Sequence, residues 1–324
     1  MSQHTIVVTG ATGFIGTALL RRLTTDAQVV ALTRDPDTAR ALLPASCTLA
    51  AWNAHEPVSP AILRGATAIV HLAGEPVAGG RWTDARKQTI LDSRARSTRA
   101  LVESIAALPR GERPRVLVSA SAVGLYGDRG DALLDESSSA GLGFLAHVCR
   151  AWETAARGAE ELGVRTVMLR LGVVLSPEGG AMARMLPPFR FGLGGRLGSG
   201  QQWMSWIHRD DAVRLIAFAL ADERVNGPLN AVAPEPLRNV DFTKALGRAL
   251  GRPTLIPVPA LGLRLMLGEM AGVMLDSQRV RPTKAHDLGF HFERATIAEA
   301  LADISAPGLV SAPVPEPATT GSAA

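Results

Sequence analysis

Short runs of β-branched residues alternate with longer segments of helical periodicity through the first two thirds of the chain. This alternation predicts βαβ units built on a parallel sheet. The expected strands are Thr5–Thr9, Gln28–Thr33, Thr48–Trp52, Ala68–Leu72, Arg115–Ser119 and Arg165–Leu169. The expected helices between them are Phe14–Leu23, Pro60–Arg64, Thr83–Leu108 and Phe144–Leu162. With right-handed crossovers, these elements predict an α/β fold with a doubly wound parallel sheet, whose ligand crevice lies at the carboxyl ends of the strands.

The pattern changes after Arg170, where a Gly/Pro-rich stretch covers residues 176–200. A helix is then expected from about Asp210 and a strand at Leu229–Val232. Helical periodicity returns in Val240–Leu250 and Leu261–Leu275, which precede the segment Phe290–Ala302.

This change of pattern predicts two domains. Residues 1–227 form the strand–helix repeat, and residues 228–304 form a smaller C-terminal α/β cap to which residues 176–207 contribute. Residues 305–324 are mainly Ala, Pro, Ser, Thr and Gly, which predicts a disordered tail.

Composition narrows the classes of function. The chain has 324 residues, 47% of them hydrophobic, which is ample for a buried core. Its net charge of +4 comes almost wholly from arginines interspersed with acids, so no basic stripe is present and no nucleic-acid partner is expected. Cys47 and Cys149 lie far apart and predict neither a disulfide nor a metal site, which fits a reducing cytoplasm.

Neither export nor a membrane partner is expected from the sequence. The chain enters a strand by about residue 5 without a charged leader and an apolar stretch, so no signal peptide is predicted. The most apolar run, Leu261–Leu275, carries Arg264 and Glu269 and is shorter than the roughly 20 residues that span a bilayer. We interpret it as a buried or interface helix.

A glycine-rich turn follows the first strand. In Gly10-x-x-Gly13-x-x-Gly16, the first glycine allows a tight turn, the second lets the backbone approach a pyrophosphate, and the third lets helix and strand pack closely. Phosphates then lie at a helix N-terminus, where free N–H groups and the helix dipole favour anions. The position of the motif between a strand and an amphipathic helix predicts a dinucleotide site.

The second strand ends in Thr33-Arg34, without the acid that binds both ribose hydroxyls of NAD. An arginine there suits a 2′-phosphate, so NADP(H) is the expected cofactor. The alternative is an exposed loop arginine that pairs with Asp35 or Asp37.

Several more specific segments carry a family resemblance: Gly10–Gly16, His71–Glu75, Arg81–Thr83, Ser93–Arg94, Ser119–Ala122, Phe144–Glu153, Gly268–Met270 and Ser277–Val280. Through them the chain resembles the extended short-chain dehydrogenases/reductases, and most closely the atypical epimerase family proteins of the SDR39U1/YfcH type. The resemblance covers the chain to about residue 302 and implies a Rossmann domain followed by a cap.

The resemblance also implies the cofactor-binding residues. The phosphate turn is lined by Gly10, Thr12, Gly13, Phe14, Ile15 and Gly16, and Thr33 precedes Arg34 at the 2′-phosphate. Trp52 and Asn53 flank the adenine, and Leu72, Ala73 and Gly74 pass beneath the ribose, with Arg94 where typical members have an asparagine. Leu171, Gly172 and Val173 match the loop at the nicotinamide amide, and Ser119, Cys149 and Arg170 complete the set.

The catalytic pair of this family is missing. The chain has a single tyrosine, Tyr126, and alignment on Glu153 places Leu145 and Cys149 where typical members have the Tyr and Lys of Tyr-x-x-x-Lys. In those enzymes the phenol transfers the proton and the lysine lowers its pKa. Ser121 still matches the family's serine.

The remaining catalytic candidates each have an alternative interpretation. Ser121 can polarise a carbonyl, while Glu75 and Tyr126 follow strands at their carboxyl ends. Tyr126 is also interpretable as part of a structural turn, and Glu75 as a capping carboxylate. No metal site is predicted.

These residues leave three functional hypotheses. The first is an NADP(H)-dependent oxidoreductase acting on a carbonyl or alcohol of an unidentified small molecule, and the second is an NADP(H)-binding sensor without turnover. A nucleotide-sugar epimerase ranks third, because Met204 stands where such enzymes have an arginine for the diphosphate. Trp82, Trp203 and Trp206 favour an apolar substrate or are ordinary core and interface residues. Formation of a homodimer stays open.

Overall fold

The computed structural model describes residues 4–305, and its centre is a seven-stranded parallel sheet. The strands, in spatial order, are β11 (Gly227–Ala231), β7 (Arg165–Leu171), β5 (Val116–Ala122), β4 (Ala66–His71), β1 (Thr5–Thr9), β2 (Gln28–Thr33) and β3 (Thr48–Ala51). The order reverses between β1 and β4, so the carboxyl ends of these two strands form the switch point where such sheets bind ligands. This is the predicted doubly wound fold.

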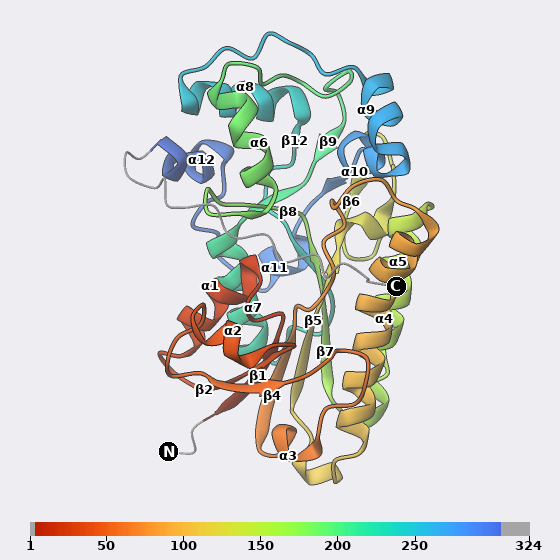
Figure 1. The fold of residues 1–324 in the computed structure, drawn as a ribbon, viewed down its shortest axis with the longest axis vertical. Helices are drawn as coiled ribbons and strands as arrows, with labels where there is room; N and C mark the ends of the chain where they lie inside the picture. Colours follow the sequence, from red (N-terminus) through yellow and green to blue (C-terminus); the bar gives the residue numbers. More distant parts are fainter. Residues whose placement is uncertain (1–3, 306–324) are drawn as a thin grey trace, which may run out of the picture.

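Helices cover both faces of the sheet (Figure 1). One face carries α1 (Phe14–Leu23) and α7 (Arg209–Ala221), and the other carries α4 (Asp84–Ala106) and α5 (Phe144–Arg157). The short helices α2 (Pro36–Arg40) and α3 (Pro60–Leu63) follow β2 and β3 in the chain.

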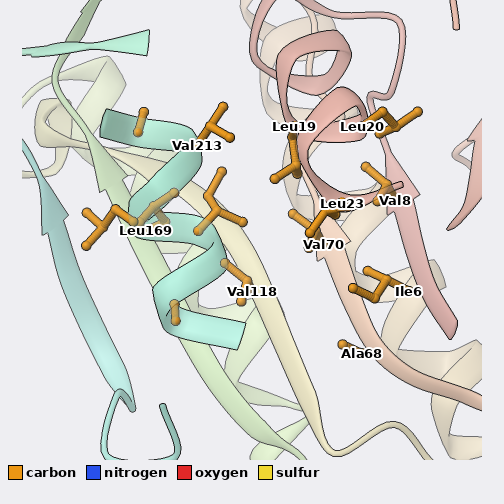
Figure 2. Packing of buried hydrophobic residues seen from close by; sticks show 14 of the residues in the cluster. Ile6, Val8, Leu19, Leu20, Leu23, Ala68, Val70, Val118, Leu169 and Val213 are labelled. Carbon is orange, nitrogen blue, oxygen red and sulfur yellow. The ribbon is translucent and has the colours of Figure 1, made fainter. Parts of the chain in front are cut away.

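Alternating strand residues form the core on each face, because successive side chains of a strand point to opposite sides. Figure 2 shows one side, where strand residues meet residues from α1 and α7: Ile6, Val8, Ala68, Val70, Val118 and Leu169 from the strands, with Leu19, Leu20, Leu23 and Val213 from the helices. The opposite side contains Val7, Ile69 and Leu117 with Leu101 and Ile105 of α4.

The cap lies beyond the carboxyl ends of the sheet (Figure 1). Its helices are α6 (Gly180–Arg190), α8 (Asn239–Leu250), α9 (Ala260–Leu267), η4 (Gly268–Ala271), α10 (Gly272–Leu275) and α12 (Ile297–Ser305), and α11 (Thr283–Asp287) follows β13. Three small strand pairs join it to the sheet: β8 (Val173–Leu175) with β10 (Trp206–His208), β9 (Trp203–Met204) with β12 (Leu237–Arg238), and β6 (Leu133–Leu134) with β13 (Arg279–Val280). Its own apolar core includes Met182, Phe189, Trp206, Phe242 and Leu246.

Two expectations need correction. The Gly/Pro-rich stretch 176–200 contains α6, which is a helix of 11 residues. The run expected as one helix over 261–275 is broken at Gly268, where φ is +61°, and α9 exposes much of its apolar side chain surface. In the segment 290–302, α12 begins at Ile297, and Phe290 and Phe292 before it pack as a loop against the core beside α7.

The boundary expected after residue 227 falls at the first residue of β11, which is the edge strand of the main sheet. The tail expected from residue 305 lies outside the described residues, apart from Ser305 at the end of α12. Within residues 4–305, no helix has both the length and the apolar character needed to cross a membrane.

Candidate nicotinamide-dinucleotide site

The turn between β1 and α1 presents the open N-terminus of a helix. No side chain caps α1 after Gly13, and no acidic residue lies in its first turn. Gly13 is exposed, and a Cβ added to it would closely approach only the carbonyl oxygen of Gly10, at 3.1 Å. Free N–H groups and the positive end of the helix dipole therefore face open space, an arrangement that binds anions.

Gly10 and Gly16 allow this turn to pack closely. Gly10 has φ +66°, and a Cβ on it would lie 2.6 Å from the carbonyl carbon of Leu72. A Cβ on Gly16 would lie 2.2 Å from the carbonyl oxygen of Gly10. The glycine turn thus lies directly against the loop that begins at Leu72, as expected at a switch point.

A histidine that the sequence analysis did not single out lies beneath this loop. His71 ends β4, with its Nδ1 2.7 Å from the Thr9 hydroxyl and its Nε2 3.3 Å from the Ser97 hydroxyl. The Thr9 hydroxyl also accepts the backbone N–H of Ala73 at 3.2 Å. Burial lowers the pKa of His71 to about 4. Near pH 7 the imidazole is therefore neutral, and it supports the loop after β4 through Thr9.

Arg34 extends into solvent from the carboxyl end of β2. Its neighbour Asp35 is engaged elsewhere, because its carboxylate accepts hydrogen bonds from the backbone N–H groups of Asp37 and Thr38 (both 3.1 Å) and from the Thr38 hydroxyl (2.5 Å). Asp35 therefore caps α2, and its carboxylate does not pair with the guanidinium of Arg34.

At the expected adenine position, the two residues behave differently. Trp52 is buried, donates its ring N–H to the Glu56 carbonyl at 2.8 Å, and packs edge-on against His71. Asn53 is exposed, although its side-chain oxygen accepts the backbone N–H of His55 at 2.9 Å. Trp52 is thus largely core, and only Asn53 offers an exposed side chain.

Arg94 of α4 reaches under the loop after β4. Its guanidinium donates to the carbonyl of Glu75 at 2.9 Å, and a Cβ on Gly74 would lie 3.3 Å from its central carbon. The same group lies 5.2 Å from the ring centroid of Trp152. Burial lowers the pKa of Arg94, while the neighbouring Cys149 and Glu75 raise it. The cation therefore lies beside Cys149, the position of the absent lysine.

The substituted pair on α5 offers no acid or base. Cys149 is buried, and burial, reinforced by the charge of Glu153, raises the pKa of its thiol to about 11. Leu145 packs near Gly124 of η2 (Val123–Tyr126), where an added Cβ would lie 3.2 Å from the Leu145 Cβ. A neutral thiol and an alkyl side chain cannot replace a phenol–lysine pair.

Ser121 belongs to a buried ion-pair network. Its hydroxyl donates to Glu153 Oε1 at 2.8 Å, and it is only 1% exposed. Arg170 donates to the same carboxylate through Nε (2.8 Å) and a terminal nitrogen (3.0 Å). As placed here, the Ser121 proton points to Glu153 and not to a substrate carbonyl, and the Arg170 side chain lies in the protein interior.

Tyr126 is hydrogen-bonded within the same network through Arg170. Its buried hydroxyl accepts from Arg170 at 2.9 Å and lies 2.7 Å from Asn230 Oδ1 and 2.9 Å from the Asp135 carbonyl. Burial raises the pKa of Tyr126 to about 12. The structure therefore supports the structural interpretation of Tyr126 and not a role as proton donor.

Glu75 is the candidate acid that remains partly exposed. Its carboxylate pairs with Arg86 at 3.1 Å, and neither side chain is more than about one third exposed. The loop after Glu75 contacts the cap, because Arg184 of α6 donates to the Ala78 carbonyl. Lys87 adds a second link through its 2.7 Å ion pair with Glu269 of η4.

Phe14, in the phosphate turn, is also covered by the cap. A Cβ on Gly179 or on Gly180 would lie 2.8 Å from its ring. The Arg209 guanidinium lies 5.5 Å from the ring centroid and forms a bidentate pair with Glu178 (2.7 and 3.0 Å). Only glycines let the cap approach the turn this closely.

The loop expected at the nicotinamide is joined to the cap as well. Gly172 donates its N–H to Ala231 at 3.0 Å, and Val173 donates to Ser205 at 2.9 Å. A Cβ on Gly172 would lie 2.7 Å from the Ser205 carbonyl oxygen. The segment Leu171–Val173 is therefore fixed between β11 and the start of β10.

The three tryptophans have separate roles. Trp206 is buried in the cap core, and the guanidinium groups of Arg238 and Arg279 lie 4.6 and 4.4 Å from the ring centroid of Trp203. Trp82 packs edge-on against Phe144, with ring centroids 5.0 Å apart. Only Trp82 lies at the Glu75 loop. Among residues 4–305, no group of three His, Cys, Asp or Glu side chains is placed to hold a metal ion.

Comparison with known proteins agrees with this geometry. Residues 6–231 match the NAD dependent epimerase/dehydratase family, and residues 258–304 match a domain of unknown function, DUF1731. An Arabidopsis thaliana protein described as "Epimerase family protein SDR39U1 homolog, chloroplastic" is 44% identical over 301 residues, which cover 93% of this chain and 86% of that protein. A Mycobacterium bovis epimerase family protein is 42% identical, with 93% and 97% of the two chains covered.

Solved structures extend the similarity. Human epimerase family protein SDR39U1, crystallised with NADPH, is 33% identical with a TM-score of 0.82, and the match covers 93% of this chain and 99% of that one. A UDP-galactose 4-epimerase is 21% identical with a TM-score of 0.71, covering 93% and 97%, and shows the shared fold alone.

Proposed function

The chain belongs to the NAD dependent epimerase/dehydratase family, and on this premise we propose that it is an NADP(H)-dependent oxidoreductase acting on a small carbonyl compound. The observation that carries the cofactor assignment is the uncapped α1 N-terminus between Gly10 and Gly16, together with Arg34 at the end of β2. The human relative bound to NADPH supports it.

The chain's own residues account for binding. The N–H groups of the first turn of α1 hold the pyrophosphate, and the Arg34 guanidinium holds the 2′-phosphate through charge-assisted hydrogen bonds. Arg94, under Gly74, places a cation at the ribose next to Cys149, where typical relatives have lysine. A bound nicotinamide supplies a hydride at this end of the sheet.

The lack of a proton donor restricts the acceptor. Tyr126 and Ser121 are committed to Arg170 and Glu153, and Cys149 and Leu145 cannot donate. Hydride addition to an aldehyde produces a strongly basic alkoxide, which requires a general acid. Addition to a quinone produces a phenolate with a pKa near 10, which takes its proton from water.

We therefore favour quinone-like acceptors for this site. In that reaction NADPH transfers a hydride to the quinone and becomes NADP⁺, the quinone becomes the hydroquinone monoanion, and a single proton from water completes the hydroquinone. Trp82 and Phe144, which pack together beside the Glu75 loop, provide an apolar aromatic surface for such a substrate. The missing phenol and lysine argue against nucleotide-sugar epimerisation.

Cofactor binding is tested by titration with NADPH and NADH. We expect NADPH to bind more tightly by about 1.5–3 kcal/mol, or roughly 10- to 150-fold, from the hydrogen bonds of Arg34 to the phosphate. Arg34→Glu should abolish this preference, whereas the control Arg40→Glu, which makes the same charge change at an exposed site on α2, should retain it. Arg94→Met should weaken both cofactors equally. Equal affinity for both cofactors in the unmodified protein would exclude the assignment.

Catalysis is tested separately by following NADPH absorbance with quinones, ketones and aldehydes. We expect turnover of quinones only. A second function is sensing of NADP(H) without turnover. It is favoured by the hydrogen bonds of Ser121 to Glu153 and of Tyr126 to Asn230, which leave neither hydroxyl to donate to a substrate. It replaces the reductase proposal if NADPH binds tightly and no acceptor is reduced.

A further inference from the structure

The upper end of the cap exposes an unusual number of large apolar side chains. We call residues 190–198 and 251–267 the cap apex. They include seven exposed large hydrophobic residues, which are Phe191, Leu193, Leu255, Ile256, Leu261, Leu265 and Met266. Leu255 is 84% exposed and Phe191 81% exposed, so these side chains contact almost nothing in the described protein. Exposed apolar residues gathered in this way mark an interaction surface.

The two segments form one surface although they are far apart in the sequence. A parallel bridge joins Leu197 to Val258, with Gly198 donating to the Val258 carbonyl at 2.8 Å and Val258 donating to the Arg196 carbonyl at 2.9 Å. The loop before α9 then runs along the upper edge of the molecule (Figure 1). The apolar side chains of both segments therefore project from the same end of the cap.

Helix α9 continues the apolar surface. Leu261 and Leu265 are four residues apart and share one face of the helix, while Leu263 is buried. Arg264 is exposed beside them. An amphipathic helix normally packs its apolar face inward, whereas α9 leaves this one in solvent.

The two segments of the cap apex carry charge of a single sign. No acidic residue occurs between Glu178 and Asp210 or between Asp241 and Glu269. The exposed cations at or next to the cap apex are Arg190, Arg196, Lys244, Arg248, Arg252 and Arg264. Three of them, Lys244, Arg248 and Arg252, line a surface hollow of about 480 Å³ beside Pro253.

We propose that the cap apex docks on the surface of an anionic phospholipid bilayer. Its leucines and phenylalanine enter the boundary between headgroups and acyl chains, and the surrounding cations contact lipid phosphates. A second copy of the chain is a poorer occupant, because the cap apex itself contains cations and no acid, so a symmetric contact would bring two sets of like charges together. Surface docking needs no spanning helix, and the proposal replaces the expectation of no membrane partner.

Sedimentation with vesicles tests the proposal. The full chain should co-sediment with vesicles of phosphatidylcholine and phosphatidylglycerol and not with phosphatidylcholine alone. Arg252→Ala with Arg264→Ala should lower the partition coefficient about 25-fold, since each basic residue near an anionic surface contributes about fivefold. Leu255→Asp with Leu265→Asp should lower it at least as much, by removing inserted apolar area and adding repulsion.

Leu142→Asp is the matched control, because Leu142 is 88% exposed and precedes α5, outside the cap apex. It should bind vesicles like the unmodified protein. Unchanged melting temperature and NADPH affinity establish that each variant is folded. The proposal is overturned if the unmodified protein binds no vesicle, or if all variants bind equally. It is also overturned if the Leu255/Leu265 variant only converts a dimer to a monomer in light scattering.

Discussion

The carboxylate of Glu153 is expected to contribute more to stability than any other single charge at the base of the site. It is 3% exposed and accepts two hydrogen bonds from Arg170 and one from Ser121. Glu153→Ala leaves a guanidinium that is 5% exposed without its anion. Breaking a buried pair in this way typically costs about 3–5 kcal/mol, against a total stability of about 5–15 kcal/mol.

The corresponding change in melting temperature follows from the size of the protein. An unfolding entropy of about 2.1 cal/mol/K per residue gives ~0.6 kcal/mol/K for about 300 residues, so the melting temperature should fall by about 5–8 °C. Calorimetry and urea denaturation at pH 7 measure the two quantities independently.

Arg157 provides an internal control on the same carboxylate. Its guanidinium lies 3.4 Å from Glu153 Oε2 but is 47% exposed. Arg157→Ala should therefore cost at most about 1 kcal/mol, as exposed pairs do. If Glu153→Ala is no more destabilising than Arg157→Ala, the reasoning that burial makes this network strong is refuted. Glu153→Met combined with Arg170→Met should be less destabilising than the sum of the single changes, because no buried charge remains unpaired.

Two further predictions concern the loops that hold the cofactor. The folded-state pKa of His71 is about 4, below its unfolded value near 6.5. The buried neutral imidazole therefore contributes fully to the free energy of unfolding above pH 6.5, and this contribution is lost as the pH falls toward 4. Between pH 7 and pH 5 the free energy of unfolding should fall by about 2 kcal/mol because of His71. Urea titrations of His71→Gln should show a loss of stability over this pH range that is smaller by about this amount. An equal loss in both proteins would contradict the assignment of His71 as a buried neutral imidazole. Gly13→Val should abolish NADPH binding while lowering the melting temperature only slightly, because φ is −76° at Gly13, the added Cβ would closely approach only the Gly10 carbonyl oxygen at 3.1 Å, and the side chain would occupy the approach of the pyrophosphate. Gly111→Val, at a glycine in η1 (Arg110–Glu112) where an added Cβ would have no atom within 4 Å, should bind NADPH normally.

The sheet could be predicted because its signal is local. Strands such as Thr5–Thr9 and Gln28–Thr33 are continuous runs of apolar and β-branched residues, typical of strands buried on both faces. The helix α6 was missed because Pro187 and Pro188 lie inside it. Its signal was nevertheless present, since Met182, Leu186 and Phe189 recur at helical spacing and all face the cap core.

The catalytic candidates could not be judged from sequence, because their orientation depends on distant partners. The Ser121 hydroxyl is directed by Glu153, which is 32 residues away, and the Tyr126 phenol by Asn230, which is 104 residues away. A motif gives the type and order of residues, whereas the direction of each side chain is set by tertiary contacts. The geometry of the glycine turn was easier to predict, because it depends on glycines within one loop.

The loss of the family lysine therefore has a specific structural consequence. With Cys149 neutral, α5 offers no charge to the ribose of the proposed cofactor, whereas Arg94 of α4, stacked on Trp152 and bonded to the Glu75 carbonyl, is proposed to supply one. A guanidinium held in this way does not give up its proton near pH 7, so it can bind and orient a ribose but cannot tune a catalytic acid as lysine does. Under the proposed function, Arg94 and Leu145 in place of a lysine–phenol pair would preserve cofactor binding and remove protein-mediated proton transfer. A site that binds the cofactor but has no proton donor of its own is what the proposed restriction to quinone-like acceptors requires.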